Sequence, residues 1–303
     1  MNHLLPQSIQ QWLTDINKDG KSIHTLQAYK RGVRHFLDWY ESVYEAEFLA
    51  NSVMARDIRD WQAHQQQIEQ SAPATVNQRL SAVKRFFKWA QLQEIITVSP
   101  AESTKAIRID QHEIKSLESK VFRRLLRAAK HNRRDFAILE VLGGTGIRVS
   151  ELLDLRIGDV EINPRSGMLI VRYGKGGGYR EIPLTQDVRQ AIQDYLEQDH
   201  PHPKDAQQSL WWGRDAALEH RSSVTRLLEK YAIHTGVEKV TPHMLRHTFA
   251  TRYLKANPDD LRGLARLLGH SDLNTVMIYT KPTLADLNKR LERMEVHRDL
   301  DDE

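Results

Sequence analysis

The chain has 303 residues and a formal net charge of +4, with a sequence pI of about 9.1. It contains no cysteine, which excludes a disulfide framework, a thiolate zinc site and a cysteine nucleophile. The length suffices for two domains, and the basic pI favours a polyanionic partner, depending on where the charges lie. No apolar run reaches membrane-spanning length and the N-terminus lacks a signal-peptide pattern, so we predict a cytoplasmic protein without a membrane partner.

The first part of the chain, residues 1–98, is predicted to be all-helical. Apolar residues at helical spacing predict helices at Leu4–Ile16, Ser22–Tyr44, Val53–Gln70 and Ala74–Gln93. The last helix carries a polar, basic face that includes Asn77, Arg79, Lys84 and Arg85. Such a face is often only a solvated surface, but it would also suit the major groove of DNA, and these four residues are our candidate DNA contacts.

A predicted linker, residues 99–115, separates this part from a second one, residues 116–303. The linker begins with Ser99-Pro100 and shows no sustained periodicity. Helices are predicted in the second part at Ser119–His131, Asp135–Gly143, Ser150–Leu155, Gln186–Gln198, Ser222–Thr235 and Leu284–Val296, and strands at Asp159–Ile162, Met168–Tyr173 and Tyr179–Pro183. The whole chain is therefore predicted to be mainly α with a small antiparallel β-sheet, an α-helical domain followed by an α+β domain.

The stretch from Thr241 to Thr280 concentrates polar residues in a helical pattern. His243 and Arg246 are three positions apart, so they project from one face of a helix. Gly269 suits the end of a second helix, and His270 follows it directly. Tyr279 then closes a short apolar run.

Several kinds of chemistry are excluded by what the sequence lacks. It has no HExxH motif, no Walker loop and no carboxylate cluster suited to Mg²⁺, and the glycine-rich stretch around Lys175 is too short for a phosphate loop. His243 and His247 have a usable metal-ligand spacing, but the cation of Arg246 beside them would repel a metal ion. We therefore predict no metal site and no cofactor.

One set of cationic and proton-donating residues suits the transfer of a phosphoryl group. They are Arg148, Lys175, His243, Arg246, His270 and Tyr279. Two arginines can offset the charge on the non-bridging oxygens of a phosphate, a role that Mg²⁺ fills elsewhere. A tyrosine nucleophile needs a base, which histidine supplies, and a lysine can protonate the leaving alkoxide. Taken singly, Arg148 could equally cap a helix, Lys175 occupy a turn and Tyr279 belong to the core.

Four segments occur in an order that resembles the tyrosine recombinase family of phage integrases, Xer-type recombinases and transposon resolvases. They are GTGIRVSELLDL, GKGGGYREIPL, TPHMLRHTFAT and LLGHSDLNTVMIYT. The resemblance covers about Leu117–Met294, and the helical first part looks like the core-binding domain of that family. It implies an α+β catalytic domain in residues 116–303 and a simple Xer-like or resolvase-like system.

The resemblance also implies a role for each matching residue. Arg148 and Arg246 match the two arginines that clamp the scissile phosphate, and Glu151 matches the acidic residue that positions the site. His243 and His270 match the histidines of the HxxR and LGH boxes. Lys175 matches the general acid for the 5′-oxygen, and Tyr279 matches the nucleophile.

The implied activity is site-specific recombination without a metal ion, through a 3′-phosphotyrosine intermediate and a Holliday junction. The implied partner is double-stranded DNA with an inverted-repeat core site, bound by a homotetramer with or without a second recombinase or accessory protein. The helix at Leu284–Met294 would then pack on a neighbouring protomer, or else on its own domain. A type IB topoisomerase-like enzyme and a catalytically silent DNA-binding protein remain alternatives. We also expect Tyr279 to lie on a movable segment, which would let a tetramer switch it on and off.

Overall fold

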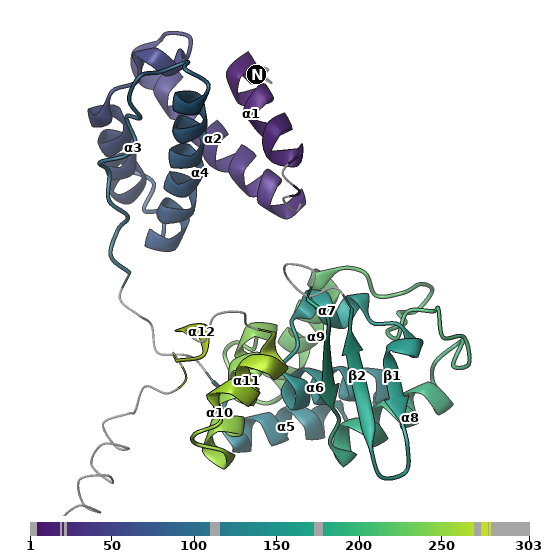
Figure 1. The fold of residues 1–303 in the computed structure, drawn as a ribbon. Coiled ribbons are helices and arrows are strands. Elements are labelled where there is room, and N and C mark those ends of the chain that lie inside the picture. Colours follow the sequence, from purple (N-terminus) through teal and green to yellow (C-terminus); the bar gives the residue numbers. More distant parts are fainter. Residues whose placement is uncertain are drawn as a thin grey trace, which may run out of the picture. The chain divides into compact units, whose positions relative to one another are not determined.

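The computed structural model describes residues 5–18, 20, 23–109, 116–172, 178–269, 274–277 and 279, without the side chains of His24, Asn274 and Thr275. The chain divides into two compact units, Met1–His112 and Glu113–Glu303 (Figure 1). As predicted, it is mainly helical with a small antiparallel sheet. None of the helices in the described part has both the length and the apolar character that crossing a bilayer requires.

The first unit is a group of helices around an aromatic core. Its elements are α1 (Gln7–Lys18), α2 (Ile23–Tyr44), the 3-10 helix η1 (Ala50–Ser52), α3 (Ala55–Gln67) and α4 (Pro73–Leu92). Phe36 lies at the centre, with its ring centroid 5.2 Å from that of Trp61 and 6.1 Å from that of Phe87. Trp12 of α1 contacts Phe86 edge-on at 5.6 Å, so each of the four α-helices contributes at least one ring to this core.

Part of the predicted linker packs against this unit. Ala101 and Thr104 are buried, and Nε2 of Gln62 donates to the backbone carbonyl of Lys105 at 3.0 Å. The amide of Asn77 both donates to the carbonyl of Ile107 and accepts its N–H, each at 2.8 Å. The stretch from Ala101 to Ile107 is therefore held by α3 and α4, because their polar side chains satisfy its backbone groups.

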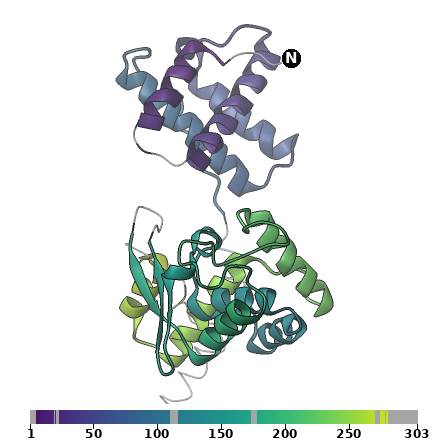
Figure 2. The ribbon, with the colours of Figure 1, turned by 90° about the vertical axis from the view of Figure 1, so that its right-hand side faces the viewer.

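The second unit combines helices with one three-stranded sheet. Its elements are α5 (Ser119–Ala129), α6 (Arg133–Thr145), α7 (Val149–Asp154), the 3-10 helix η2 (Ile157–Asp159), β1 (Val160–Ile162), β2 (Gly167–Val171), β3 (Arg180–Pro183), α8 (Gln186–Gln198), α9 (Arg221–His234), α10 (Pro242–Ala256), α11 (Leu261–Leu268) and α12 (Asn274–Met277). The strands form one antiparallel sheet in the order β1-β2-β3 (Figure 1 and Figure 2). Leu169 lies opposite Val160 on one side and opposite Ile182 on the other.

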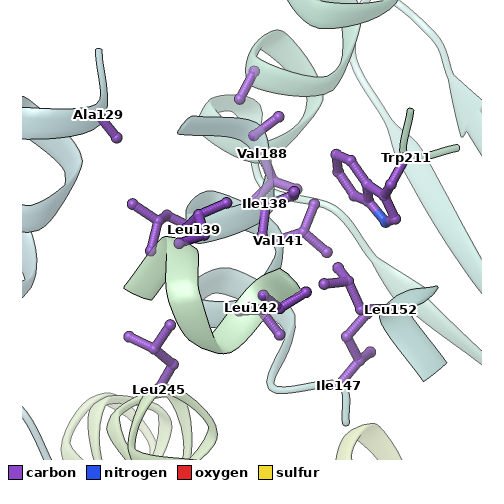
Figure 3. Packing of buried hydrophobic residues seen from close by; sticks show 14 of the residues in the cluster. Ala129, Ile138, Leu139, Val141, Leu142, Ile147, Leu152, Val188, Trp211 and Leu245 are labelled. Carbon is purple, nitrogen blue, oxygen red and sulfur yellow. The ribbon is translucent and has the colours of Figure 1, made fainter. Parts of the chain in front are cut away.

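Helix α6 is the centre of the second unit. Its Ile138, Leu139, Val141 and Leu142 are fully buried, and Trp211 lies close to them (Figure 3). Further residues of the same cluster come from neighbouring elements: Leu152 of α7, Val188 of α8 and Leu245 of α10. Because α6 is covered on several sides, its two ends are fixed in place, and the turn at its C-terminal end leads into α7.

The end of α6 differs from the prediction, which stopped the helix at Gly143. The helix continues to Thr145 and ends at Gly146, whose φ of 65° is left-handed. Gly143 is helical because a neighbour needs the space: a β-carbon there would lie 2.2 Å from Cζ of Phe122. The glycine thus permits close packing of α5 on α6 and does not act as a helix stop.

The carboxyl of Glu140 on α6 should make folding stability depend on pH. Burial raises its pKa to about 7, Asp187 adds to the rise and Arg252 opposes it. The folded state therefore binds more protons than the unfolded chain between pH 4.5 and 7, so stability falls as pH rises through this window. We expect Glu140→Gln to raise the free energy of unfolding by about 1 to 3 kcal/mol at pH 8 and not at pH 4.5.

Urea unfolding at the two pH values measures this difference. The matched control is Glu229→Gln, since Glu229 lies exposed on α9. An equal effect of Glu140→Gln at both pH values would contradict the prediction.

Candidate active site

Arg148 lies at the start of α7, directly after the turn that ends α6. Its backbone N–H donates to Oε2 of Glu151 and its Nη1 donates to Oε1, both at 2.8 Å. Glu151 occupies the third position of the helix, from which a side chain reaches back to the helix start. The carboxylate therefore holds the guanidinium from one side, while the Arg148 side chain stays 26% exposed and can meet a ligand.

Arg246 supplies a second guanidinium from the buried face of α10. Its Nη1 donates to the carbonyl of Gly146 at 2.7 Å and its Nη2 to the carbonyl of Leu268 at 2.9 Å. Burial and the nearby charge of Arg148 lower its pKa to about 10, so it remains charged at neutral pH. Gly146 precedes Arg148 by two positions, and this hydrogen bond therefore brings the two arginines into one site.

Two histidines of α10 lie beside the arginines. The ring centroids of His243 and His247 are 4.1 Å apart and the rings meet edge to face. Desolvation, Arg246 and Arg148 lower the pKa of His243, while burial is the main cause that lowers the pKa of His247 to about 4. Both imidazoles are therefore neutral at pH 7, and a neutral imidazole can accept a proton. His243 is the exposed one of the two.

Tyr279 reaches this site from the chain beyond α12. Its half-buried ring packs against a small cluster that includes Leu264 and Leu268 of α11, and its centroid lies 5.3 Å from that of His247. Burial raises the pKa of the phenol, whereas the charges of Arg246 and Arg148 act to lower it. The phenol is therefore neutral here, and it lies within the electrostatic influence of both arginines.

Four of the six predicted site residues thus come together: Arg148, His243, Arg246 and Tyr279. Lys175 and His270 lie outside the described residues, as does the predicted helix Leu284–Val296. Two guanidinium groups that share one partly exposed site suit an anion with several oxygens, such as a phosphate. In the described part of the chain no group of three or more acidic or histidine side chains is arranged to hold a metal ion.

One residue of the site escaped the sequence reasoning, namely Arg180 at the start of β3. It is 8% exposed and binds the same Glu151 carboxylate that holds Arg148. A signal existed in the strand pattern, because Arg180 and Ile182 face inwards while Glu181 faces outwards. A charged residue at an inward position of a strand indicates a buried partner of opposite charge.

Comparison with known proteins identifies the family. Residues 115–285 match the model of the phage integrase family, and residues 9–94 match that of its N-terminal SAM-like domain. The chain belongs to the phage integrase family of tyrosine recombinases. It is therefore an enzyme of DNA strand breakage and rejoining in site-specific recombination, as the sequence motifs predicted.

Relatives match this recombinase along almost its whole length. The tyrosine recombinase XerA of Thermococcus kodakarensis is 32% identical over 291 residues, which cover 95% of both chains. XerA of Pyrococcus furiosus is 33% identical over 300 residues, covering 98% of this chain and 97% of its own. The structure of the recombinase XerH bound to a palindromic difH substrate, a post-cleavage complex, shares the fold with a TM-score of 0.75 at 19% identity, over 95% of this chain and 85% of XerH.

The candidate DNA contacts of the recombinase lie on α4, and each has a partner within the first unit. Arg79 donates to Glu69 at 3.0 Å, and Asn77 binds the backbone of Ile107. The guanidinium of Arg85 lies 5.9 Å from the ring centroid of Tyr29, and Nζ of Lys84 donates to the carbonyl of Glu102 at 3.5 Å. Lys84, Arg85 and Lys88 also line a surface hollow of about 290 Å³. These four contacts stay predictions.

The buried His247 should weaken the recombinase in mild acid. Its pKa of about 4 lies below the value near 6.5 of the unfolded chain, so the unfolded state binds more protons between these values. Stability then falls as pH drops from 6.5 towards 4, by about 2 kcal/mol between pH 7 and pH 5 from this group. Between pH 7 and pH 5 we therefore expect the free energy of unfolding of His247→Gln to fall by about 2 kcal/mol less than that of the wild type.

Denaturant unfolding at pH 7 and pH 5 measures the effect. His220→Gln serves as the matched control, because His220 is an exposed histidine of the same unit. Parallel curves for the wild type and His247→Gln would contradict the prediction.

Proposed function

We propose that the recombinase cleaves DNA at a specific site by attack of Tyr279 on the scissile phosphate. One observation carries this proposal: Arg148, Arg246 and Tyr279 come from three distant segments and interact electrostatically in one site. In the reaction the Tyr279 oxygen forms a bond to phosphorus and the bond from phosphorus to the 5′-oxygen breaks. The product is a 3′-phosphotyrosine, and the same step in reverse, with a different 5′-hydroxyl, rejoins the strand.

The two arginines are proposed to bind the non-bridging oxygens of that phosphate. Their charges would offset the negative charge that these oxygens carry in the transition state, so the reaction needs no metal ion. Both cations are held by groups of the protein itself: Arg148 by Glu151, and Arg246 by the carbonyls of Gly146 and Leu268. Such fixed donors need little reorganisation when the substrate binds.

Proton transfers are assigned to the remaining polar residues. His243 is neutral at pH 7 and would accept the phenolic proton of Tyr279, since a phenol whose pKa is raised by burial is a weak nucleophile without a base. Lys175 would give a proton to the departing 5′-oxygen, and His270 would add a further donor to the phosphate. The last two roles rest on the sequence motifs.

Assembly belongs to the same proposal. Residues 1–98 would bind DNA as the core-binding domain, residues 99–115 would link the domains, and residues 116–303 would carry the chemistry. A homotetramer on double-stranded DNA with inverted-repeat core sites would exchange strands through a Holliday junction. The segment Leu284–Met294 would pack on a neighbouring protomer. A cytoplasmic location stays a prediction.

A movable Tyr279 would explain how such a tetramer limits cleavage to selected protomers. The observation that supports this idea is burial: the ring packs on α11 and burial raises its pKa, so the phenol is poorly reactive in the described conformation. A change that exposed the hydroxyl to the arginines would lower the pKa and activate it.

Replacement of the nucleophile tests the mechanism directly. The protein is incubated with nicked DNA that carries its site, and SDS-stable protein–DNA adducts are measured. We expect the wild type to form the adduct and Tyr279→Phe to form none, because only the hydroxyl can bond to phosphorus. Tyr253→Phe is the matched control and should react like the wild type, since the Tyr253 hydroxyl binds Asp260 instead.

Each other outcome favours a different function. An adduct that survives Tyr279→Phe would refute the assigned nucleophile, and the absence of any wild-type adduct would favour a silent DNA-binding protein. Cleavage and resealing of any DNA sequence without strand exchange would favour a topoisomerase-like enzyme.

Removal of divalent metal tests the role of the arginines. With two guanidinium groups on the phosphate, we expect the rate of adduct formation to stay the same when EDTA replaces Mg²⁺ at constant ionic strength. A rate that falls to background in EDTA and returns with Mg²⁺ would refute the metal-independent mechanism.

A further inference from the structure

The side chain of Arg180 is buried next to Glu151, the residue that also holds Arg148. It begins β3, where its backbone pairs with Val171 of β2. Arg180 is only 8% exposed, and burial of a guanidinium is costly unless its donors find partners. The partners of Arg180 therefore indicate why the strand carries a charge at an inward position.

Arg180 shares one carboxylate with Arg148. Its Nη1 and Nη2 donate to Oε1 and Oε2 of Glu151 at 3.1 Å and 2.7 Å, while Arg148 donates to the same two oxygens from its Nη1 and its backbone N–H. Glu151 thus accepts four hydrogen bonds, and its orientation is fixed from both sides. Although burial raises the pKa of this carboxyl, the hydrogen bonds from Arg180 and Arg148 outweigh that effect and keep it ionised.

Arg180 also binds the C-terminal end of α11. Its Nε donates to the carbonyl of Leu267 at 2.9 Å, and Arg246 donates to the next carbonyl, that of Leu268. Cations at this end of a helix satisfy its free carbonyls. Adjacent carbonyls of one helix are therefore held by Arg180 on one side and by Arg246 on the other.

Gly269 leaves the space in which the Arg180 guanidinium lies. A β-carbon at this position would be 2.9 Å from Nη1 and 3.1 Å from Cζ of Arg180. Its φ of 66° also favours glycine. Gly269 is therefore favoured for two reasons: the Arg180 guanidinium lies too close for a β-carbon, and the backbone is left-handed at the end of α11.

We propose that Arg180 is a positioning residue for strand cleavage. It links Glu151 to the end of α11, so that Arg148 and Arg246 face one phosphate. This inference rests on the proposed phosphate-binding role of the two arginines. We assign Arg180 no contact with the substrate, because the residue is buried and its Nε, Nη1 and Nη2 donate to Leu267 and Glu151. It acts through Arg148, whose guanidinium would lose a fixed support without it.

The test is Arg180→Lys, which keeps the charge but cannot bind two oxygens and a carbonyl in one plane. We expect the single-turnover rate of adduct formation at saturating protein to fall about 10- to 100-fold, since small displacements of positioned groups have effects of this size. DNA affinity should stay at the wild-type level. Arg133→Lys, which alters an exposed ion pair with Asp199 in the same unit, should change neither.

A double-mutant cycle separates positioning from a merely structural role. If Arg180 acts through Arg148, the rate losses of Arg180→Lys and Arg148→Lys should be less than additive in free energy. Additive losses, or an unchanged rate in Arg180→Lys, would overturn the proposal. Should Arg180→Lys fail to fold, Arg180→Gln, which keeps hydrogen-bond donors at this position, replaces it in the same cycle. A wild type without any Tyr279 adduct would instead refute the proposed function, and the positioning role with it.

Discussion

Two like charges, those of Arg148 and Arg246, lie close together in one site. Their repulsion and the burial of Arg246 oppose this arrangement, and together they lower the pKa of Arg246 to about 10. The fold offsets the cost with the carboxylate of Glu151 and with the backbone carbonyls of Gly146 and Leu268. The two carbonyls lie at the ends of α6 and α11, and Glu151 lies in the first turn of α7, so the arginine pair links three helix ends.

The charges of the two arginines also act on the neutral side chains beside them, His243, His247 and Tyr279. Cations nearby favour the neutral form of an imidazole, and they contribute to the lowered pKa of both His243 and His247. They favour the charged form of a phenol, but burial of Tyr279 on α11 has the larger effect and raises its pKa. The site therefore holds neutral imidazoles and a neutral phenol, which is the protonation state that the proposed roles of His243 and Tyr279 require.

Local patterns sufficed for much of the fold. Helical spacing of apolar residues predicted the helices of the first unit, and short alternating runs predicted the three strands, because each signal lies within a few neighbouring residues. The prediction was wrong at Gly143, where the glycine makes room for Phe122 of another helix. It also missed the contacts of residues 101–107 with α3 and α4, since those depend on side chains such as Asn77 that are distant in the sequence.

By itself the sequence determined the family and a set of candidate site residues: residue types and motif order singled out Arg148, His243, Arg246 and Tyr279, since reactivity resides in the side chains themselves. Only the tertiary structure decided how these residues meet. The hydrogen bond from Arg246 to Gly146 joins α10 to the end of α6, and Arg180 joins β3 to Glu151 and to α11. Such contacts produce no periodic pattern in the amino-acid sequence, because their strength comes from burial and charge complementarity between distant segments.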